Sequence, residues 1–187
     1  MSKDAAATRL LLVRAARRRF AVDGYRATTV RDIAADAGVN VALINRYFVS
    51  KEGLFRACLD RAARDLQPDS RDLDRVLDEL VDHVLSSPTD EDSMQLLLLV
   101  RSTGDDRVDV IRRETLRHHA ERLAAVAVPD RGGALDDALL VRAEIALSVV
   151  LGMTMMRTAT RVEPLASADG SLLREPLRAA LRALLVG

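Results

Sequence analysis

The segment from Gly38 to Gly53, G-V-N-V-A-L-I-N-R-Y-F-V-S-K-E-G, places polar and cationic side chains among core-sized apolar residues. Its Asn, Arg, Tyr and Lys side chains suit polar recognition, because amides and hydroxyls form hydrogen bonds and cations bind anions. A helix buried on all sides would not carry these groups, and a fully solvated helix would not carry so much apolar bulk. We therefore expect one face of the segment on a protein core and the other face against a partner.

The remaining polar residues do not form a pattern that supports catalysis. An enzyme would need a nucleophile beside its base, paired acids or a glycine-rich loop that cradles phosphate. The segments R-G-G-A and S-T-G-D are turns with too little glycine for such a loop. Side chains of the adjacent His118 and His119 diverge by about 100° on a helix and cannot easily share a metal ion. We expect these two and His83 on the surface, and we expect no enzymatic activity, metal or cofactor.

Composition limits the fold and suggests a polyanionic partner. The chain has 187 residues, of which 49% are hydrophobic and 30% charged, so it can bury a core and is not a disordered chain. Residues 1–65 hold 13 Arg and Lys against 7 Asp and Glu, whereas the formal net charge of the whole chain is zero. A basic N-terminal module joined to an acidic remainder indicates that the N-terminal part meets a polyanion.

Helical patterns separated by turn residues predict an all-α fold of about nine helices. They cover residues 6–22, 29–37, 40–48, 51–66, 72–86, 91–103, 106–127, 134–160 and 171–186, with a linker at 67–72. In the first of these helices, the stripe of Leu12, Ala16 and Phe20 is expected to face inward. Arg14, Arg17 and Arg18 are expected to face outward.

The second and third helices form a helix-turn-helix arrangement. Thr29 and Asp32 form a short capping box, Asn40 is placed to cap the third helix and Ser50 to cap the fourth. Gly38 supplies the tight turn between the second and third helices. Apolar residues must hold the two helices on the first one, and these are Ile33, Val39, Ile44 and Phe48. The outward residues of the third helix are then Val41, Ala42, Leu43, Asn45, Arg46 and Tyr47.

The stretch T-T-V-R-D-I-A-A-D-A-G-V-N-V-A-L-I-N-R-Y-F-V-S-K-E-G-L-F, Thr28 to Phe55, resembles the DNA-binding signature of the TetR family of transcriptional regulators. The preceding segment from Ala15 to Tyr25, A-A-R-R-R-F-A-V-D-G-Y, is similar to the end of that family's first helix. The resemblance implies a ligand-responsive regulator, most often a repressor, that binds a palindromic operator in double-stranded DNA as a homodimer. A small-molecule effector would release it. The implied domains are a helix-turn-helix domain at 1–50, a connecting helix at 51–66 and an effector-binding and dimerisation domain at 67–187.

Transferred position by position, the resemblance predicts the DNA contacts. Thr29 and Arg31 would lie beside DNA at the start of the second helix. The leading edge of the recognition helix would be Asn40, Val41, Ala42 and Leu43. Phosphate contacts would come from Asn45, Tyr47 and Lys51.

Three positions depart from the family pattern. Asn45 stands where an aromatic residue is usual, and Arg19, expected to snorkel over the first helix, stands where Leu is frequent. The tip Val41-Ala42-Leu43 has no hydrogen-bonding side chain, so it can read thymine methyl groups while Arg31 or Arg46 reads guanine. Structural alternatives remain open: pairing of Arg31 with Asp32 or Asp36, a surface role for Lys51, half-burial of Tyr47 and inward packing of Leu43.

The acidic remainder suggests a dimer interface. The helix at 134–160 is apolar nearly all round from Ile145 to Met156, so it is expected to be buried on two sides. In the last helix, Leu173, Leu177, Ala180 and Leu184 recur at helical spacing and predict a seam for a second helix. Pro176 is expected to kink this helix or to make it restart.

An effector pocket is predicted from adaptable or polar side chains of the same part of the chain. Its candidate residues are Met94, Arg101, His118, Met153 and Met156. The alternatives are that the Met residues are ordinary core and that Arg101 forms an ion pair.

The sequence also indicates a location and two competing functions. A lone cysteine, Cys58, fits a reducing compartment. The N-terminus lacks a signal-peptide pattern, and the 12-residue apolar run from Ile145 to Met156 is too short for a membrane span, so a cytoplasmic protein is expected. The competing functions are an effector-independent DNA-binding dimer and, far behind it, an enzyme.

Overall fold

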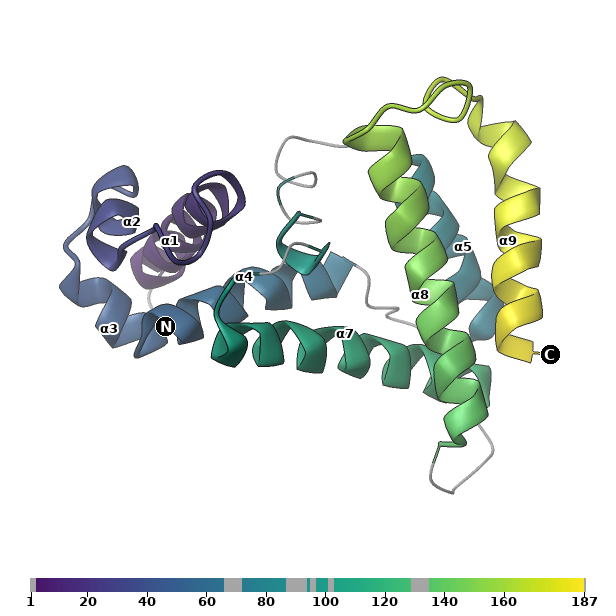
Figure 1. The fold of residues 1–187 in the computed structure, drawn as a ribbon, viewed down its shortest axis with the longest axis horizontal. Coiled ribbons are helices and arrows are strands. Elements are labelled where there is room, and N and C mark those ends of the chain that lie inside the picture. The colour runs from purple at the N-terminus through teal and green to yellow at the C-terminus, as the bar shows by residue number, and fades with distance from the viewer. Residues whose placement is uncertain are drawn as a thin grey trace. The chain divides into compact units, whose positions relative to one another are not determined.

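The computed structural model describes residues 3–65, 72–86, 94, 97–100, 103–128 and 135–186. In these residues every regular element is a helix, which confirms the predicted all-α class (Figure 1). The helices are α1 (Lys3–Val22), α2 (Val30–Asp36), α3 (Ala42–Phe48), α4 (Lys51–Asp65), α5 (Leu73–Leu85), α7 (Asp106–Ala127), α8 (Asp137–Thr158) and α9 (Gly170–Val186). Residues 94 and 97–100 are also helical, and most of the predicted linker at 67–72 lies outside the described residues.

Packing divides the chain into two units. One unit comprises Met1–Ala62 and Asp90–Thr115, and the other comprises Ala63–Thr89 and Leu116–Gly187. The first part of α7 therefore belongs to the same unit as the helix-turn-helix. The domain bounds drawn from the sequence, 1–50 and 67–187, remain a prediction.

The first unit is built around α1. Leu12, Ala16 and Phe20 are buried, as predicted from their spacing. The expected outward position of Arg17 is wrong, because only 1% of this residue is exposed. Arg17 lies four residues from both Val13 and Ala21, which are also buried, so α1 has a second buried stripe that the sequence analysis did not identify.

Residues from α2, α3 and α4 complete this core. The buried residues include Ile33 and Ala34 of α2, Ile44 and Phe48 of α3, and Leu54, Phe55, Cys58 and Leu59 of α4. The rings of Phe20, Tyr25 and Phe55 lie 5.2 to 5.5 Å apart and join the end of α1 to α4. Aromatic contacts of this kind stabilise a core beyond their buried area. They therefore stabilise the packing of α1 against α4, on which the helix-turn-helix depends.

In the second unit, α9 packs against both α5 and α8. Its buried residues are Leu177, Leu181 and Leu185. Arg178 also donates hydrogen bonds to Asp74 and Asp78 of α5, at 2.7 and 2.9 Å. The helix continues through Pro176 as one element, so the expected restart does not occur.

The apolar helix α8 buries one side within its own chain. Leu139, Ala143, Leu147 and Val150 are buried, whereas Ile145 is 45% exposed, so the second side expected to be buried is open in a single chain. At 22 residues α8 is long and apolar enough to cross a membrane by length and composition, a criterion that the 12-residue run alone does not meet. Core helices of soluble proteins meet the same criterion, and the packing of α8 against α5 and α9 is of this kind.

Candidate nucleic-acid interface

The start of α2 is fixed by the predicted capping box. The backbone N–H of Asp32 donates to Oγ1 of Thr29 at 3.2 Å, and the backbone N–H of Thr29 donates to Oδ2 of Asp32 at 2.9 Å. A hydrogen bond from Oγ1 of Thr29 to Oδ2 of Asp32 at 2.7 Å, followed by the bond from the Thr29 backbone N–H, holds the pKa of the Asp32 carboxyl below its usual value. Thr29 is exposed, so it can stand beside DNA while its hydroxyl serves the cap.

The turn and the start of α3 also follow the sequence prediction. Gly38 has a φ of 65°, a left-handed conformation that glycine adopts without strain. The backbone N–H of Ala42 donates to Oδ1 of Asn40 at 2.8 Å, so Asn40 caps α3. The backbone N–H of Gly53 donates to Oγ of Ser50 at 3.1 Å, which caps α4 in the same way.

The outer face of α3 is available to a partner. Ile44 and Phe48 point into the core, while Val41 just before α3 is 38% exposed. The other predicted contacts on α3 are exposed at Ala42, Asn45 and Arg46 and half-buried at Leu43 and Tyr47. The half-burial of Leu43 and Tyr47 leaves part of each side chain accessible, so both their packing role and their predicted DNA contacts stay open. The apolar tip and the polar flank therefore share one exposed surface.

Two arginines supply positive charge to this surface. Arg31 of α2 is exposed, and the carboxylates suggested as its alternative partners are engaged by others: Asp32 by Thr29, and Asp36 by Arg19. The structure records no ion pair for Arg31 within the described residues, which leaves its guanidinium free for a ligand. The guanidinium of Arg46 lies 5.9 Å from the ring centre of Tyr47, on the outer side of α3.

Lys51 has an internal contact that the sequence analysis did not foresee. Its Nζ donates to the backbone carbonyl of Tyr25 at 2.6 Å and lies 4.1 Å from the centre of the Tyr25 ring. Partial burial lowers the pKa of the Lys51 ammonium. An ammonium has three donors, so the phosphate contact predicted for Lys51 would use a donor that Tyr25 leaves available.

Arg19 does not snorkel over α1 as expected. It forms a two-pronged ion pair with Asp36 at the end of α2 and also contacts Asp23. Asp36 is 17 residues from Arg19 in sequence. The ion pair therefore depends on the packing of α2 against α1 and could not be predicted from local sequence.

The effector pocket predicted from five residues remains a prediction. Met94 and Met153 are half-buried, His118 and Met156 are exposed, and Arg101 lies outside the described residues. None of the four described residues lines the cavity of about 300 Å³ in the first unit, which is bordered by Phe20, Tyr25, Phe55 and Gly104 among others. His119 is buried, which corrects its predicted surface position, and burial lowers its pKa to about 4.

The predicted dimer residues share one stripe of α9 but differ in exposure. Leu177 is buried in its own chain, Ala180 is exposed, and Leu173 and Leu184 are half-buried. Among the described residues, no group of three or more His, Cys, Asp or Glu side chains is arranged to hold a metal ion.

Together, the fold and this surface define a helix-turn-helix DNA-binding protein. A family model described as bacterial regulatory proteins of the tetR family matches residues 12–58, and a Tetracyclin repressor-like C-terminal domain matches residues 74–185. The chain therefore belongs to the TetR family, and it is a DNA-binding regulator of transcription rather than an enzyme.

Solved structures with the same fold come from several bacteria. A TetR-family transcriptional regulator from Rhodococcus sp. has a TM-score of 0.69 at 18% identity, over 96% of this chain and 99% of that one. A TetR-family regulator from Streptomyces coelicolor A3 has a TM-score of 0.53 at 27% identity, over 96% and 95%. MexZ, a repressor responsible for antibiotic resistance in Pseudomonas aeruginosa, has a TM-score of 0.63 at 21% identity, over 95% and 94%. Among curated proteins, none matches this chain.

Proposed function

We propose that the chain is a repressor that binds a palindromic operator as a homodimer and leaves the DNA when a small-molecule effector binds. The observation that carries this proposal is the exposed outer face of α3, together with the exposed Arg31 on α2. A helix with such a face fits the major groove of DNA and can reach base edges there. The description of MexZ as a repressor supports the direction of regulation.

In this proposal the recognition surface reads bases in two ways. Val41, Ala42 and Leu43 have no hydrogen-bonding side chains, so they contact thymine methyl groups and sense the shape of the groove. Arg31 forms the paired hydrogen bonds to guanine, while Asn45, Tyr47 and Lys51 hold phosphates. Arg46 is the alternative guanine reader.

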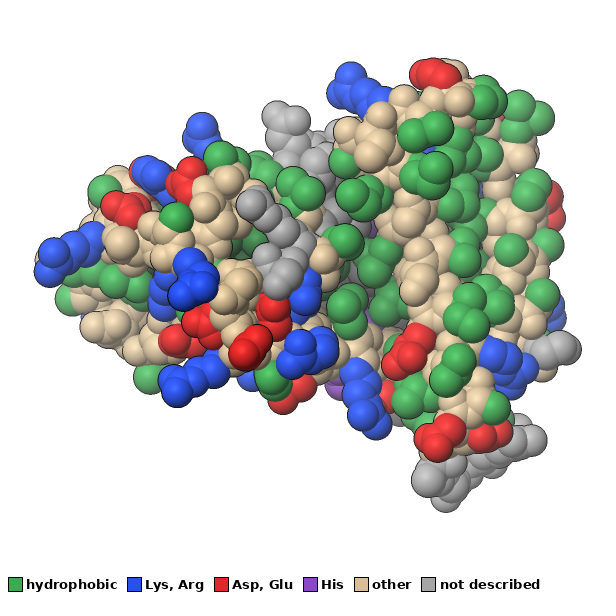
Figure 2. All heavy atoms as spheres, in the orientation of Figure 1, with side chains coloured by type: hydrophobic (Ala, Val, Ile, Leu, Met, Phe, Trp, Pro, Cys, Tyr) green, Lys and Arg blue, Asp and Glu red, His purple; other side chains and the backbone are tan. Residues whose placement is uncertain are grey.

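The homodimer is supported by apolar surface on the second unit. Figure 2 shows hydrophobic side chains gathered over α8 and α9 on the face in view. Val141, Ile145 and Met156 of α8 are 43 to 53% exposed, and Leu172 and Val186 of α9 are 70 and 55% exposed. A second copy would bury this surface, as in a four-helix dimer interface. The partner-facing side of α9 would then include Ala180 but exclude Leu177, which is buried in its own chain.

The effector is proposed to bind within the C-terminal part of the chain, which matches a Tetracyclin repressor-like domain. Met153 is the best placed of the predicted residues, because it is half-buried on α8. Its flexible thioether suits contact with apolar ligands of varied shape.

Selection of DNA by the purified full-length protein tests the proposal. A pool of random-sequence duplexes is incubated with the protein at moderate salt, and the bound fraction is sequenced over successive rounds. We expect enrichment of an inverted repeat with half-site centres about 10 base pairs, or a multiple of that, apart. The affinity should fall with salt at a slope near −0.9 for each phosphate neutralised.

A compound library added to the selected complex then tests the effector response. Dissociation by a small molecule that also binds the free protein supports the proposal. Enrichment of no sequence would contradict it outright. A specific complex that no compound dissociates would favour the effector-independent dimer instead.

A further inference from the structure

Asp36, the last residue of α2, stands where a negative charge is unfavourable. The C-terminus of a helix carries partial negative charge from its unpaired carbonyl groups, so an acidic residue there needs a positive partner. The last turn of α2 has no basic residue of its own. The charge that balances Asp36 must come from another element.

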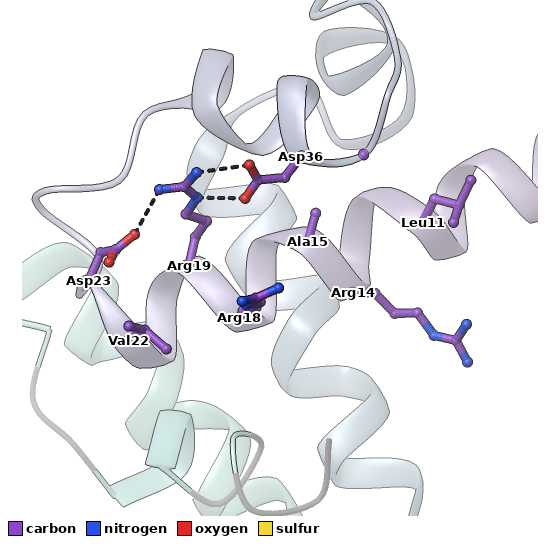
Figure 3. A pocket seen from close by; sticks show the side chains of 9 residues that line it. Leu11, Arg14, Ala15, Arg18, Arg19, Val22, Asp23 and Asp36 are labelled. Atoms are coloured by element: carbon purple, nitrogen blue, oxygen red, sulfur yellow. Dashed lines mark hydrogen bonds and ion pairs between the residues drawn. The ribbon is translucent and has the colours of Figure 1, made fainter. Parts of the chain in front are cut away.

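Arg19 of α1 supplies that charge through two hydrogen bonds to Asp36, and a third bond reaches Asp23 (Figure 3). Its Nε donates to Oδ2 of Asp36 at 2.6 Å, and its Nη2 donates to Oδ1 of Asp36 at 2.8 Å. Its Nη1 donates to Oδ2 of Asp23 at 3.1 Å. The Arg19 guanidinium lowers the pKa of the Asp36 carboxyl, and the two carboxylates raise the pKa of Arg19.

The capping box fixes the start of α2, but its end, which receives this clamp, has few other contacts to fix it. With seven residues each, α2 and α3 are too short to be stable without packing. Only Ile33 and Ala34 of α2 are buried. Asp36 is two residues before Gly38, the turn from which α3 starts, so a tilt at the end of α2 would be passed on to the recognition helix.

We propose that Arg19 is a positioning residue for DNA recognition: by clamping the end of α2 to α1, it sets the orientation in which α3 meets the major groove. The inference rests on the sequence-specific binding proposed above. All three guanidinium nitrogens of Arg19 are engaged by Asp36 and Asp23, so its effect does not require contact with DNA. An exposed ion pair contributes little to overall stability, and its removal should change binding more than folding.

The test compares variants that separate geometry from charge. R19L and D36N each break the clamp, and the double variant R19L/D36N removes both charges together. The swapped variant R19D/D36R restores an ion pair between α1 and α2 with the two charges exchanged. R75L is the matched control, because Arg75 also forms an exposed ion pair, with Glu79 on α5 in the other unit.

Binding is measured by fluorescence anisotropy on two duplexes: one selected by the wild-type protein from the random pool, and one scrambled duplex of equal length. We expect R19L, D36N and the double variant to bind the selected duplex about tenfold more weakly, with changes of threefold or less on the scrambled duplex. The slope of affinity against salt should stay unchanged, and the swapped variant should recover most of the loss. R75L should bind both duplexes as the wild type does, and urea unfolding should show all variants folded.

Three results would overturn the inference. Wild-type affinity of R19L for the selected duplex would show that orientation does not depend on the clamp. Recovery of full affinity in R19L/D36N would show that the unpaired Asp36 charge alone caused the loss. A salt slope reduced by about one in R19L would make Arg19 a phosphate contact. If the wild-type protein selects no sequence, the proposed function has failed instead.

Discussion

In the proposed function, base reading would depend most on Arg31, because both neighbouring carboxylates are held by other groups. Replacing Arg31 with Ala should weaken binding to the selected duplex by about 1–3 kcal/mol and relax the preference at one base pair, since a paired arginine–guanine contact is worth that much. The measurement is anisotropy titration against a panel of single-base variants of the duplex. Arg46→Ala is the matched control on α3. An unchanged base preference in Arg31→Ala would transfer the reading role to Arg46.

Lys51 is expected to contribute both to folding and to DNA affinity. Lys51→Met keeps the apolar stem but loses the hydrogen bond to the Tyr25 carbonyl and the contact with its ring. The free energy of unfolding should fall by about 1 kcal/mol, and affinity for selected and scrambled duplexes should fall alike. Urea unfolding and anisotropy measure the two effects separately.

The control for Lys51 is Arg56→Met on the same helix. Arg56 forms an exposed ion pair with Glu114, which should change stability by less than about 0.5 kcal/mol. If Lys51→Met unfolds like the wild type, the contact with Tyr25 does not stabilise the fold and only the phosphate contact remains to be tested.

The contacts that could be predicted from the sequence are those set by residues a few positions away. The caps of Thr29, Asn40 and Ser50 depend on neighbours two or three positions away, and the structure confirms all three. The environments of Arg17 and Arg19 depend on packing between helices, and both predictions were wrong for that reason. Assignment of the individual DNA contacts remains a prediction.

In the first turn of α4, Gly53 is required by a close approach of the chain to the end of α3. A Cβ atom added to Gly53 would lie 2.0 Å from the carbonyl oxygen of Phe48, the last residue of α3. Gly53→Ala should therefore displace the start of α4 and lower the free energy of unfolding by about 1–3 kcal/mol. Urea unfolding monitored by circular dichroism measures this effect.

Gly152 in α8 is the matched control for Gly53, because a Cβ added there meets no atom of the chain within 4 Å. Gly152→Ala should raise the free energy of unfolding by up to about 1 kcal/mol, since alanine favours a helix over glycine. Wild-type stability of Gly53→Ala would mean that the turn relaxes without cost, and the idea of a fixed junction would then be dropped.

The existence of the helices could be predicted from apolar spacing, and their bounds from turn residues. The prediction at 106–127 agrees with α7, and that at 171–186 differs from α9 by one residue at its start. The sequence leaves a kink or a restart open at Pro176, and the structure has one continuous helix that packs against α5 and α8. The close approach at Gly53 is also a property of the folded turn, with no signal in the sequence.

Across the whole molecule, burial of His119 should make stability depend on pH. Its pKa is lowered from 6.5 to about 4, mainly by burial and further by His118 and Arg122. The unfolded chain therefore binds a proton in this range that the folded chain does not, so stability is full above pH 6.5 and is lost as pH falls toward 4. At about pH 5 this loss should reach about 2 kcal/mol.

Variants at the two neighbouring histidines test the contribution of burial. Between about pH 7.5 and about pH 5, the free energy of unfolding of His119→Leu should fall by about 2 kcal/mol less than that of the wild type. Urea unfolding measures this difference. His118→Gln is the control and should keep the wild-type dependence, because His118 is exposed. Equal pH dependence in all three proteins would show that His119 is not kept neutral by the fold.

In the second unit, α8 has an exposed apolar surface that a second copy of the chain would cover. Ile145 is 45% exposed at the middle of α8, although the opposite side of the helix is fully packed. Ile145→Glu should leave the fold intact but raise the dimer dissociation constant at least tenfold, because a carboxylate buried between subunits lacks a partner. Sedimentation velocity over a range of concentrations measures this constant.

Val110→Glu is the control, since Val110 is 41% exposed on α7 in the other unit and should leave the dimer intact. Operator binding should weaken with dimerisation, because one recognition helix alone reads only a half-site. A dimer of Ile145→Glu as tight as the wild type would place the interface elsewhere.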